Sequence, residues 1–206
     1  MKQTELLIAT SNSGKLGEIR SVLGDLPIAL LSLADFPDIQ SVDEGGDSFA
    51  ENAGLKAAGY AKQAGVLTLA DDSGLVVDAL KGAPGVHSAR YLGEQASYAE
   101  RIRGLLTELN SLPDEARTAR FVCALTIASA DSELVYRTEA TCEGLIADAP
   151  RGTGGFGYDP VFIPRGFDQT FGELPATVKN RISHRGKALI EARKFIASLT
   201  ATSGAG

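Results

Sequence analysis

The chain has few of the residues that build disulfide frameworks and zinc sites. Among its 206 residues there are only two cysteines and two histidines. Cys123 and Cys142 each lie inside an apolar run and form no close pair, a pattern typical of small core residues in a reducing compartment. His87 and His184 lie far apart and belong to no H-E-x-x-H motif, so the sequence argues against a zinc site.

Long apolar runs and an excess of positive charge are also missing. No stretch approaches the length of a membrane span and no basic-then-apolar signal precedes the first predicted strand, so we expect a cytoplasmic protein with no membrane partner. The formal net charge is −6, which argues against a nucleic-acid partner. With 44% hydrophobic and 22% charged residues, the chain can bury a substantial core, as one domain or as two lobes that share a core.

The hydrophobic pattern predicts β-α units followed by an antiparallel pair. Short apolar runs predict strands at residues 6–9, 28–33 and 66–70, and helical spacing predicts helices at 16–23, 49–62, 97–109 and 183–199. Two further runs predict a hairpin at 119–128 and 134–142, and a brief strand is expected at 161–163. This order is typical of a mixed sheet flanked by helices, in the α/β or α+β class. We expect one domain over residues 1–200 and a frayed tail at 201–206.

The most informative segment places two adjacent acids directly after an apolar run. Asp71 and Asp72 follow the predicted strand 66–70, and Ser73 and Gly74 come next. In open α/β sheets, ligands bind at the carboxyl ends of the strands. Neighbouring carboxylates raise each other's pKa unless a cation joins them, and a hard divalent metal would relieve that conflict. The alternative is a simple turn whose acids are solvated.

A polar turn leads into the first predicted helix. Its residues are Thr10, Ser11, Asn12, Ser13, Gly14 and Lys15. A helix start presents free backbone N–H groups and the positive end of the dipole, which suits a phosphate, and Lys15 adds a point charge. A Walker A loop is excluded because Ala9 and Leu16 stand where that motif needs Gly and Ser or Thr. The alternative is an ordinary capped helix.

A glycine-rich segment spans residues 152–159. It satisfies G-x-G-x-x-G, but a short apolar strand follows it instead of the helix that a dinucleotide fingerprint requires. Bare backbone lets a flat ligand approach closely, and Phe156 or Tyr158 offers a face on which a base can stack. The alternative is a mobile loop whose aromatic side chains fill the core.

Basic residues gather at the start of the last predicted helix. Ser183 can cap it, which places His184 and Arg185 in the first turn, with Lys179 shortly before. Cations are unfavourable at the positive end of a helix, so their position suggests an anionic or carbonyl-bearing ligand. The alternative is a solvated arginine and a capping histidine.

The helix at 49–62 carries a polar face. Ser48 can cap it, and Glu51 is placed to complete a capping box. Asn52 and Lys56 are four residues apart and share one side of the helix. Most such faces are solvated, but this one follows an acidic loop and could border a metal site.

Taken together, these motifs closely resemble the Ham1-type, or inosine triphosphate pyrophosphatase, family from Leu6 to about Ala197. The resemblance rests on six segments in order: T-S-N-S-G-K (10–15), S-F-A-E-N-A-G-L-K-A (48–57), A-D-D-S-G-L (70–75), G-A-P-G-V-H-S-A-R-Y (82–91), G-G-F-G-Y-D-P (154–160) and I-S-H-R (182–185). Two departures are small. The family usually has T-G-N at residues 10–12 and E-T-G at residues 44–46, where this chain has T-S-N and E-G-G.

The resemblance implies a two-lobed α/β fold with a mixed central sheet, a nucleotide cleft between the lobes, and usually a homodimer. It implies Mg²⁺-dependent hydrolysis of non-standard purine nucleoside triphosphates (ITP, dITP and XTP) to the monophosphate and pyrophosphate. Asp72 would be the proton acceptor and a metal-associated acid. The residues that would bind substrate are Thr10, Ser11, Asn12, Ser13, Gly14, Lys15, Ser73, Phe156, Gly157, Tyr158, Asp159, Lys179, His184 and Arg185.

The chemistry of the residues fits that reaction. Hydrolysis at the α-phosphorus needs positioning, charge neutralisation and an oriented water more than covalent catalysis. Asp72 can orient or deprotonate the water, Mg²⁺ can bridge phosphate oxygens, and Lys15 with Lys56 can balance the remaining charge. We expect Glu44 to be a second metal acid, with Asp71 behind it.

Base selectivity also has a physical explanation. Lysine and arginine side chains only donate hydrogen bonds. If Lys179 or Arg185 points at purine position 6, it can donate to a 6-oxo oxygen but has no acceptor for the 6-amino group of adenine. Leaving such a group unpaired costs about 1–3 kcal/mol. Two alternatives stay open: a Maf-like pyrophosphatase that acts on other modified nucleotides, and a non-catalytic nucleotide-binding regulator.

Overall fold

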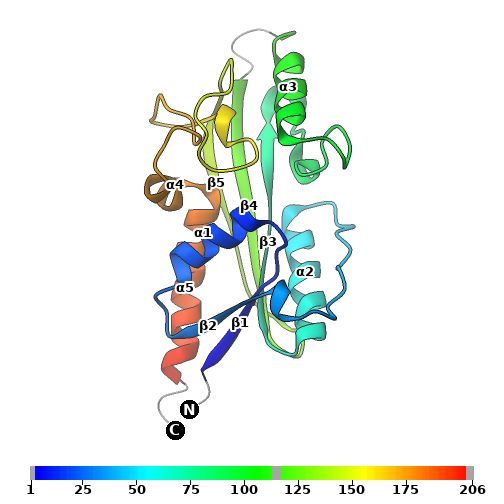
Figure 1. Ribbon diagram of the computed structural model, residues 1–206, viewed down its shortest axis with the longest axis vertical. Helices are drawn as coiled ribbons and strands as arrows, with labels where there is room; N and C mark the ends of the chain where they lie inside the picture. The colour runs from blue at the N-terminus through cyan, green and yellow to red at the C-terminus, as the bar shows by residue number, and fades with distance from the viewer. Residues whose placement is uncertain (1–2, 113–116, 203–206) are drawn as a thin grey trace. The chain divides into compact units, whose positions relative to one another are not determined.

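The structure is a computed structural model that describes residues 3–112 and 117–202. Within that part, one mixed sheet has the strand order β2-β1-β3-β4-β5-β6 (Figure 1). The strands are β1 (Thr4–Ile8), β2 (Ile28–Ser32), β3 (Leu67–Val77), β4 (Thr118–Ala128), β5 (Leu134–Ile146) and β6 (Phe162–Pro164). The α-helices are α1 (Ser13–Leu23), α2 (Phe49–Ala64), α3 (Tyr98–Leu109), α4 (Ala176–Ile182) and α5 (His184–Thr202).

The sheet is mixed, as predicted. β1 pairs in parallel with β2 and with β3, whereas β5 pairs antiparallel with β6. β4 and β5 are neighbours joined by residues 129–133, which is the expected hairpin. The α/β class is therefore confirmed.

The chain divides into two compact units. The first comprises the chain up to Asp72, Cys123–Ala140 and the chain from Arg185 onward, and the second comprises Ser73–Val122 and Thr141–His184. The boundaries fall inside β3, β4 and β5 and at the start of α5. For that reason no linker composition marks them in the sequence.

The first unit has a core on both faces of its strands. Leu6 and Ile8 of β1 belong to a cluster with apolar residues of α1 and α5, whereas Leu7 and Ala9 belong to a cluster with α2. Figure 1 shows α2 on one side of these strands and α1 and α5 on the other. This division follows from the two-residue repeat of a β-strand, which sends successive side chains to opposite faces.

The same alternation decides where the two acids lie. Leu69 of β3 packs in the α1/α5 cluster and Ala70 in the α2 cluster. The predicted strand end at Ala70 is wrong, because β3 continues through both acids to Val77. It is β1 that ends here, since its pairing with β3 stops at Leu69. Asp71 therefore faces α1 and α5, and Asp72 faces α2.

The second unit is built around aromatic residues. Its core cluster contains Phe121, Phe162 and Phe171 together with apolar residues of α3. α4 was not predicted from the sequence, because it has seven residues and begins after Pro175 without a side-chain cap. Cys123 in the first unit and Cys142 in the second are both free and buried, as expected.

Helix boundaries lie close to those expected. Ser48 caps α2 by accepting the Glu51 N–H at 3.2 Å, but the Glu51 carboxylate accepts from Asp47 N–H at 3.0 Å, so the predicted capping box does not form. α5 runs to Thr202, three residues beyond its expected end, and residues 203–206 of the expected tail lie outside the described residues. In the described ranges, no helix combines the length and apolar character that crossing a membrane requires.

Candidate active site

The turn before α1 is held by its own side chains. The Asn12 Oδ1 accepts the Lys15 N–H at 3.1 Å, and the Thr10 Oγ1 accepts the Asn12 N–H at 3.2 Å. Asn12 is thus the N-cap of α1, which confirms the capped turn that the sequence indicates. Ser11 and Ser13 are exposed, so the polar surface of the turn faces solvent at the positive end of an eleven-residue helix.

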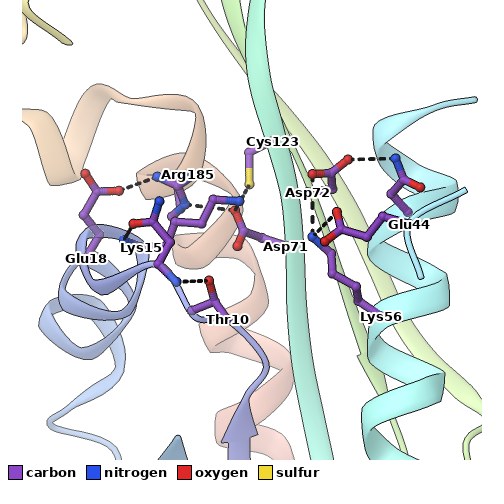
Figure 2. A network of polar contacts seen from close by, with 11 residues as sticks. Thr10, Lys15, Glu18, Glu44, Lys56, Asp71, Asp72, Cys123 and Arg185 are labelled. Atoms are coloured by element: carbon purple, nitrogen blue, oxygen red, sulfur yellow. Dashed lines mark hydrogen bonds and ion pairs between the residues drawn. The ribbon is translucent and has the colours of Figure 1, made fainter. Parts of the chain in front are cut away.

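Lys15 belongs to a buried ionic network on the α1/α5 face of β3 (Figure 2). Its ammonium lies 3.1 Å from the Asp71 Oδ2, and the same oxygen accepts from the Arg185 Nε at 3.0 Å. The Arg185 Nη1 donates to the Glu18 Oε2 at 2.5 Å, and the Cys123 Sγ lies 4.0 Å from the Asp71 Oδ2. Two cations and two carboxylates from three elements thus meet beside one thiol.

The charges in this network fix one another. Burial alone would raise the pKa of Asp71, but the charges of Lys15 and Arg185 outweigh it and hold that pKa far below its usual value. Burial would lower the pKa of Arg185, but Asp71 and Glu18 raise it above its usual value. Burial and the Asp71 charge raise the pKa of the Cys123 thiol to about 12. Asp71 and Arg185 are therefore held in their charged forms, and the Cys123 thiol is held neutral.

This network bears on the interpretation of Arg185, whose role in substrate binding stays a prediction. Its position in the first turn of α5 was expected to attract an anionic or carbonyl-bearing ligand. Asp71 and Glu18 supply that negative charge from within the protein, and Arg185 is 2% exposed. The two carboxylates therefore explain why a cation can lie at the positive end of this helix.

Asp72 occupies a different environment on the α2 face (Figure 2). The Asn52 Nδ2 donates to the Asp72 Oδ2 at 3.1 Å, and the Lys56 ammonium lies 3.6 Å from the Asp72 Oδ1. The same ammonium donates to the Glu44 Oε2 at 3.0 Å. The Asn52 Oδ1 accepts the Gly46 N–H at 2.9 Å, which ties the acidic loop to α2. Asn52 and Lys56 share one side of α2, as their spacing predicted.

The electrostatics of this group differ from those around Asp71. Burial raises the pKa of Asp72 above its usual value, although Lys56 and Lys15 partly oppose it. Burial would lower the pKa of Lys56, but Asp72, Asp71 and Glu44 outweigh it and raise that pKa. Lys56 therefore stays charged, and Asp72 is more basic than a surface aspartate.

The two adjacent acids are not crowded together. Figure 2 shows Asp71 directed toward Lys15 and Arg185, and Asp72 directed toward Lys56 on the other side of β3. The expectation that they share one site is corrected by the strand geometry. Asp71 is part of the buried ionic network, and Asp72 belongs with Glu44.

The donor set around Asp72 suits a magnesium ion that arrives with its substrate. In the described residues, no group of three or more His, Cys, Asp or Glu side chains is arranged to hold a metal. Asp72 and Glu44 both contact the Lys56 ammonium, so two hard oxygen donors converge on one positive charge. Mg²⁺ usually binds through one or two carboxylates, with substrate phosphates and water completing its shell. These residues fit that pattern.

A second polar group lies in the second unit. Asp159 pairs with the Lys179 ammonium, and both side chains are buried. The same carboxylate accepts the Phe156 N–H at 2.7 Å, and the Lys179 ammonium lies 4.6 Å from the centre of the Phe156 ring. Gly155 has a φ of +69°, and a Cβ there would meet the Asp159 Oδ2 at 2.0 Å. Only glycine fits this turn, which brings three predicted site residues together.

Four other predicted site residues also lie in this unit. Tyr158 is buried in the core, so the alternative that an aromatic side chain of this segment fills the core is confirmed for it. His184 is buried and its ring stacks on Phe121 with centroids 4.6 Å apart. Ser73 is half-buried within β3, and Gly157 has a φ of +64°.

Sequence reasoning missed two residues that hold these groups. Glu18 lies three residues after Lys15 on α1, so helical spacing could have paired it with the basic residues. Ser88 lies in the G-A-P-G-V-H-S-A-R-Y motif, to which we had given no chemistry, and it accepts the Tyr158 O–H through its carbonyl.

Comparisons with known proteins show the family of the chain. Residues 6–195 match the model of the Ham1 family. A dITP/XTP pyrophosphatase of Geobacter sulfurreducens is 52% identical over 186 residues, which cover 90% of this chain and 93% of that protein. A dITP/XTP pyrophosphatase of Geobacillus kaustophilus is 52% identical over 185 residues, covering 90% of each chain.

A solved structure extends the likeness to the fold. The structure of a HAM1 protein from Coxiella burnetii superposes with a TM-score of 0.85 at 40% identity, covering 95% of this chain and all (100%) of that one. The family model and the relatives span nearly the whole described chain, including both polar groups. The chain therefore belongs to the Ham1 family.

Proposed function

We propose that this protein is a nucleoside-triphosphate pyrophosphatase that hydrolyses ITP, dITP and XTP to the monophosphate and pyrophosphate. Relatives that are 52% identical are dITP/XTP pyrophosphatases. The observation that carries the proposal is Asp72, a buried carboxylate with a raised pKa, held by Asn52 and flanked by Lys56. Such an acid is suited to accept a proton, because its basicity is enhanced while its orientation is fixed.

Asp72 acts as the proton acceptor for the attacking water. Water attacks the α-phosphorus, the proton passes to an Asp72 oxygen, and the bond to the bridging oxygen of pyrophosphate breaks. The Asn52 amide holds one oxygen of Asp72, which leaves the other facing the Lys56 side. The reaction needs no covalent intermediate, since positioning and charge balance supply most of the catalysis in phosphoryl transfer.

Asp72 and Glu44 would hold Mg²⁺, and both already converge on one cation, Lys56. When bound, the ion would neutralise phosphate charge and stabilise the leaving pyrophosphate. Lys56 supports this arrangement, because its charge attracts both carboxylates and partly offsets their charge before substrate arrives.

The turn from Thr10 to Lys15 binds the polyphosphate. Its exposed serines and the N-terminus of α1 offer hydrogen-bond donors to anionic oxygens. Lys15 adds a charge that Asp71 orients at 3.1 Å, and an ammonium has further donors available for a phosphate.

Lys179 and Phe156 recognise the purine, with Ser73 and His184 as further substrate-binding residues. Lys179 only donates, so it favours a 6-oxo group over the 6-amino group of adenine. An unmatched pair of donors costs about 1–3 kcal/mol. Arg185 was the other candidate for this contact, and its pairing with Asp71 and Glu18 favours Lys179 instead.

The test is hydrolysis of ITP, dITP, XTP and ATP with Mg²⁺ in H₂¹⁸O, with products resolved by ion exchange and mass spectrometry. We expect pyrophosphate and a monophosphate that carries the ¹⁸O label. Release of orthophosphate, label in pyrophosphate, or equal rates on ATP would contradict the proposal. The family resemblance also supports a homodimer, which sedimentation would test in the same preparation.

A further inference from the structure

Tyr158 ties the glycine-rich segment to a distant part of the second unit. Its side chain is 2% exposed, and its O–H donates to the Ser88 carbonyl at 3.1 Å, across 70 residues of sequence. Its ring meets Tyr98 edge-on, with centroids 5.7 Å apart and an interplanar angle of 89°. Tyr158 thus has a polar partner, the Ser88 carbonyl, and an aromatic partner, Tyr98, which is half-buried and packs against the core.

Ser88 is itself a fixed acceptor. Its hydroxyl donates to the Gly85 carbonyl at 2.6 Å and accepts the Leu75 N–H at 2.9 Å. Leu75 lies in β3, so the turn that carries Ser88 is fastened to a central strand. The Ser88 carbonyl, which accepts the Tyr158 hydrogen bond, is therefore held in place by β3.

Tyr98 is held as firmly. The Arg101 guanidinium lies 5.0 Å from the centre of the Tyr98 ring. Arg101 is buried and donates to the carbonyls of Tyr91 at 3.1 Å and Gly93 at 3.2 Å. Both partners of Tyr158 are thus anchored independently of the glycine-rich segment.

The residue after Tyr158 organises the base-recognition group. The Asp159 carboxylate accepts the Phe156 N–H and pairs with the Lys179 ammonium. Gly155 and Gly157, on either side of Phe156, both have positive φ, so the tight turn places Phe156 close to the Tyr158–Asp159 pair. A change in the position of Tyr158 would therefore shift Asp159, and with it Phe156 and Lys179.

We propose that Tyr158 is a positioning residue for purine recognition, acting through its hydrogen bond to Ser88. It fixes the turn so that Asp159 presents Lys179 and Phe156 to the base, and it makes no contact with the substrate. This inference rests on the proposed function, in which Lys179 and Phe156 bind the purine. It replaces the earlier expectation that Tyr158 offers a stacking face.

The test compares Tyr158→Phe with Tyr91→Phe. Both remove one phenol oxygen from the second unit, but the Tyr91 O–H donates to Glu108 at the surface, outside the purine-binding group. For Tyr158→Phe we expect the KM for ITP to rise about three- to tenfold and the preference for ITP over ATP to fall. The kcat should stay within about twofold of the wild type, since Asp72 is unaffected. Tyr91→Phe should change none of these values.

The outcomes separate the two proposals. A wild-type protein that does not hydrolyse ITP would refute the proposed function itself. With an active wild type, equal KM and equal base preference in both variants would overturn the role of Tyr158. A loss of kcat at unchanged KM would also overturn it, as would a Tyr158→Phe protein that circular dichroism shows to be unfolded at the assay temperature.

Discussion

Asp71 and Asp72 allow one substitution, Asp to Asn, to be made at adjacent positions with opposite expected effects. The change is isosteric and removes one negative charge in each case. Asp71 lies between two buried or half-buried cations, whereas Asp72 is itself a buried acid with a raised pKa. The two variants should therefore differ in stability, although they differ only in which of the two adjacent positions carries the asparagine.

Asp71→Asn should strongly destabilise the fold. It takes away the carboxylate shared by Lys15 and Arg185, and Arg185 is buried beside it. Breaking a buried ion pair by removing one partner costs about 3–5 kcal/mol. For a chain of this size each kcal/mol lowers Tm by about 2–4 °C, so the expected decrease is about 6–20 °C.

Asp72→Asn should leave stability unchanged or increase it. A carboxylate whose folded pKa is raised favours folding most when it is protonated, and its ionisation at neutral pH opposes folding. The amide removes that cost, and Lys56 keeps Glu44 as a partner. Turnover of ITP should nevertheless fall by about 100-fold or more, because the proton acceptor is gone.

The two aspartates should also contribute to the pH dependence of stability with opposite signs. The folded pKa of Asp71 is lowered, so its stabilising contribution is present above the ordinary value of 3.8 and is lost as the pH falls through the lower folded value. The Tm difference between wild type and Asp71→Asn should therefore be constant near neutral pH and narrow below about pH 4. The contribution of Asp72 has the opposite sign: it is complete below 3.8 and is lost as the pH rises through the raised folded pKa.

Thermal unfolding by circular dichroism at pH 7, combined with ITP hydrolysis, checks this contrast. Equal losses of Tm in the two variants would refute the assignment of the acids to different environments. An Asp72→Asn protein with full turnover would remove Asp72 from the chemistry, whatever its stability.

Three further predictions concern the residues around these acids. Lys56→Gln removes a charge that lowers the pKa of Asp72, so the acid limb of the kcat/KM profile should move to higher pH; an unchanged limb would contradict the coupling. Lys179→Met should reduce discrimination between ITP and ATP by about 5- to 150-fold, measured as the ratio of kcat/KM values, and retained discrimination would exclude Lys179 as the donor. Gly155→Ala should lower Tm and raise the KM for ITP, because its Cβ would lie 2.0 Å from the Asp159 carboxylate; wild-type values for both would show that the turn relaxes easily.

The sequence predicted most elements because their signals are local. The apolar repeat and the Ser48 cap placed α2, and the alternating runs placed β4 and β5. The sequence predicted that β3 ends at Ala70. Aspartates are rare in strands, so the two acids and the glycine that follow indicated a turn. The strand persists because Asp71 and Asp72 both find cations from other elements, and that pairing depends on tertiary structure.

Side-chain roles were harder to predict than the positions of motifs. Most residues around Asp71, Asp72 and Asp159 lie in segments that the sequence had indicated, although Glu18 does not. Spacing alone could not show which of these side chains were buried. Arg185 turned out to be paired within the protein, and Tyr158 turned out to be a core residue. Both depend on contacts more than 60 residues apart, Arg185 with Asp71 across 114 and Tyr158 with Ser88 across 70.

The back-to-back arrangement on β3 makes the register of this strand unusually consequential. Side chains on a strand exchange faces when the chain slips by one residue. Deleting a single residue just before Asp71 would turn Asp72, the proposed proton acceptor, toward Arg185, and would turn Asp71 toward α2. A deletion of one residue would then disrupt both the buried ionic network and the proton acceptor. A deletion of two residues would leave each aspartate on its original face of β3.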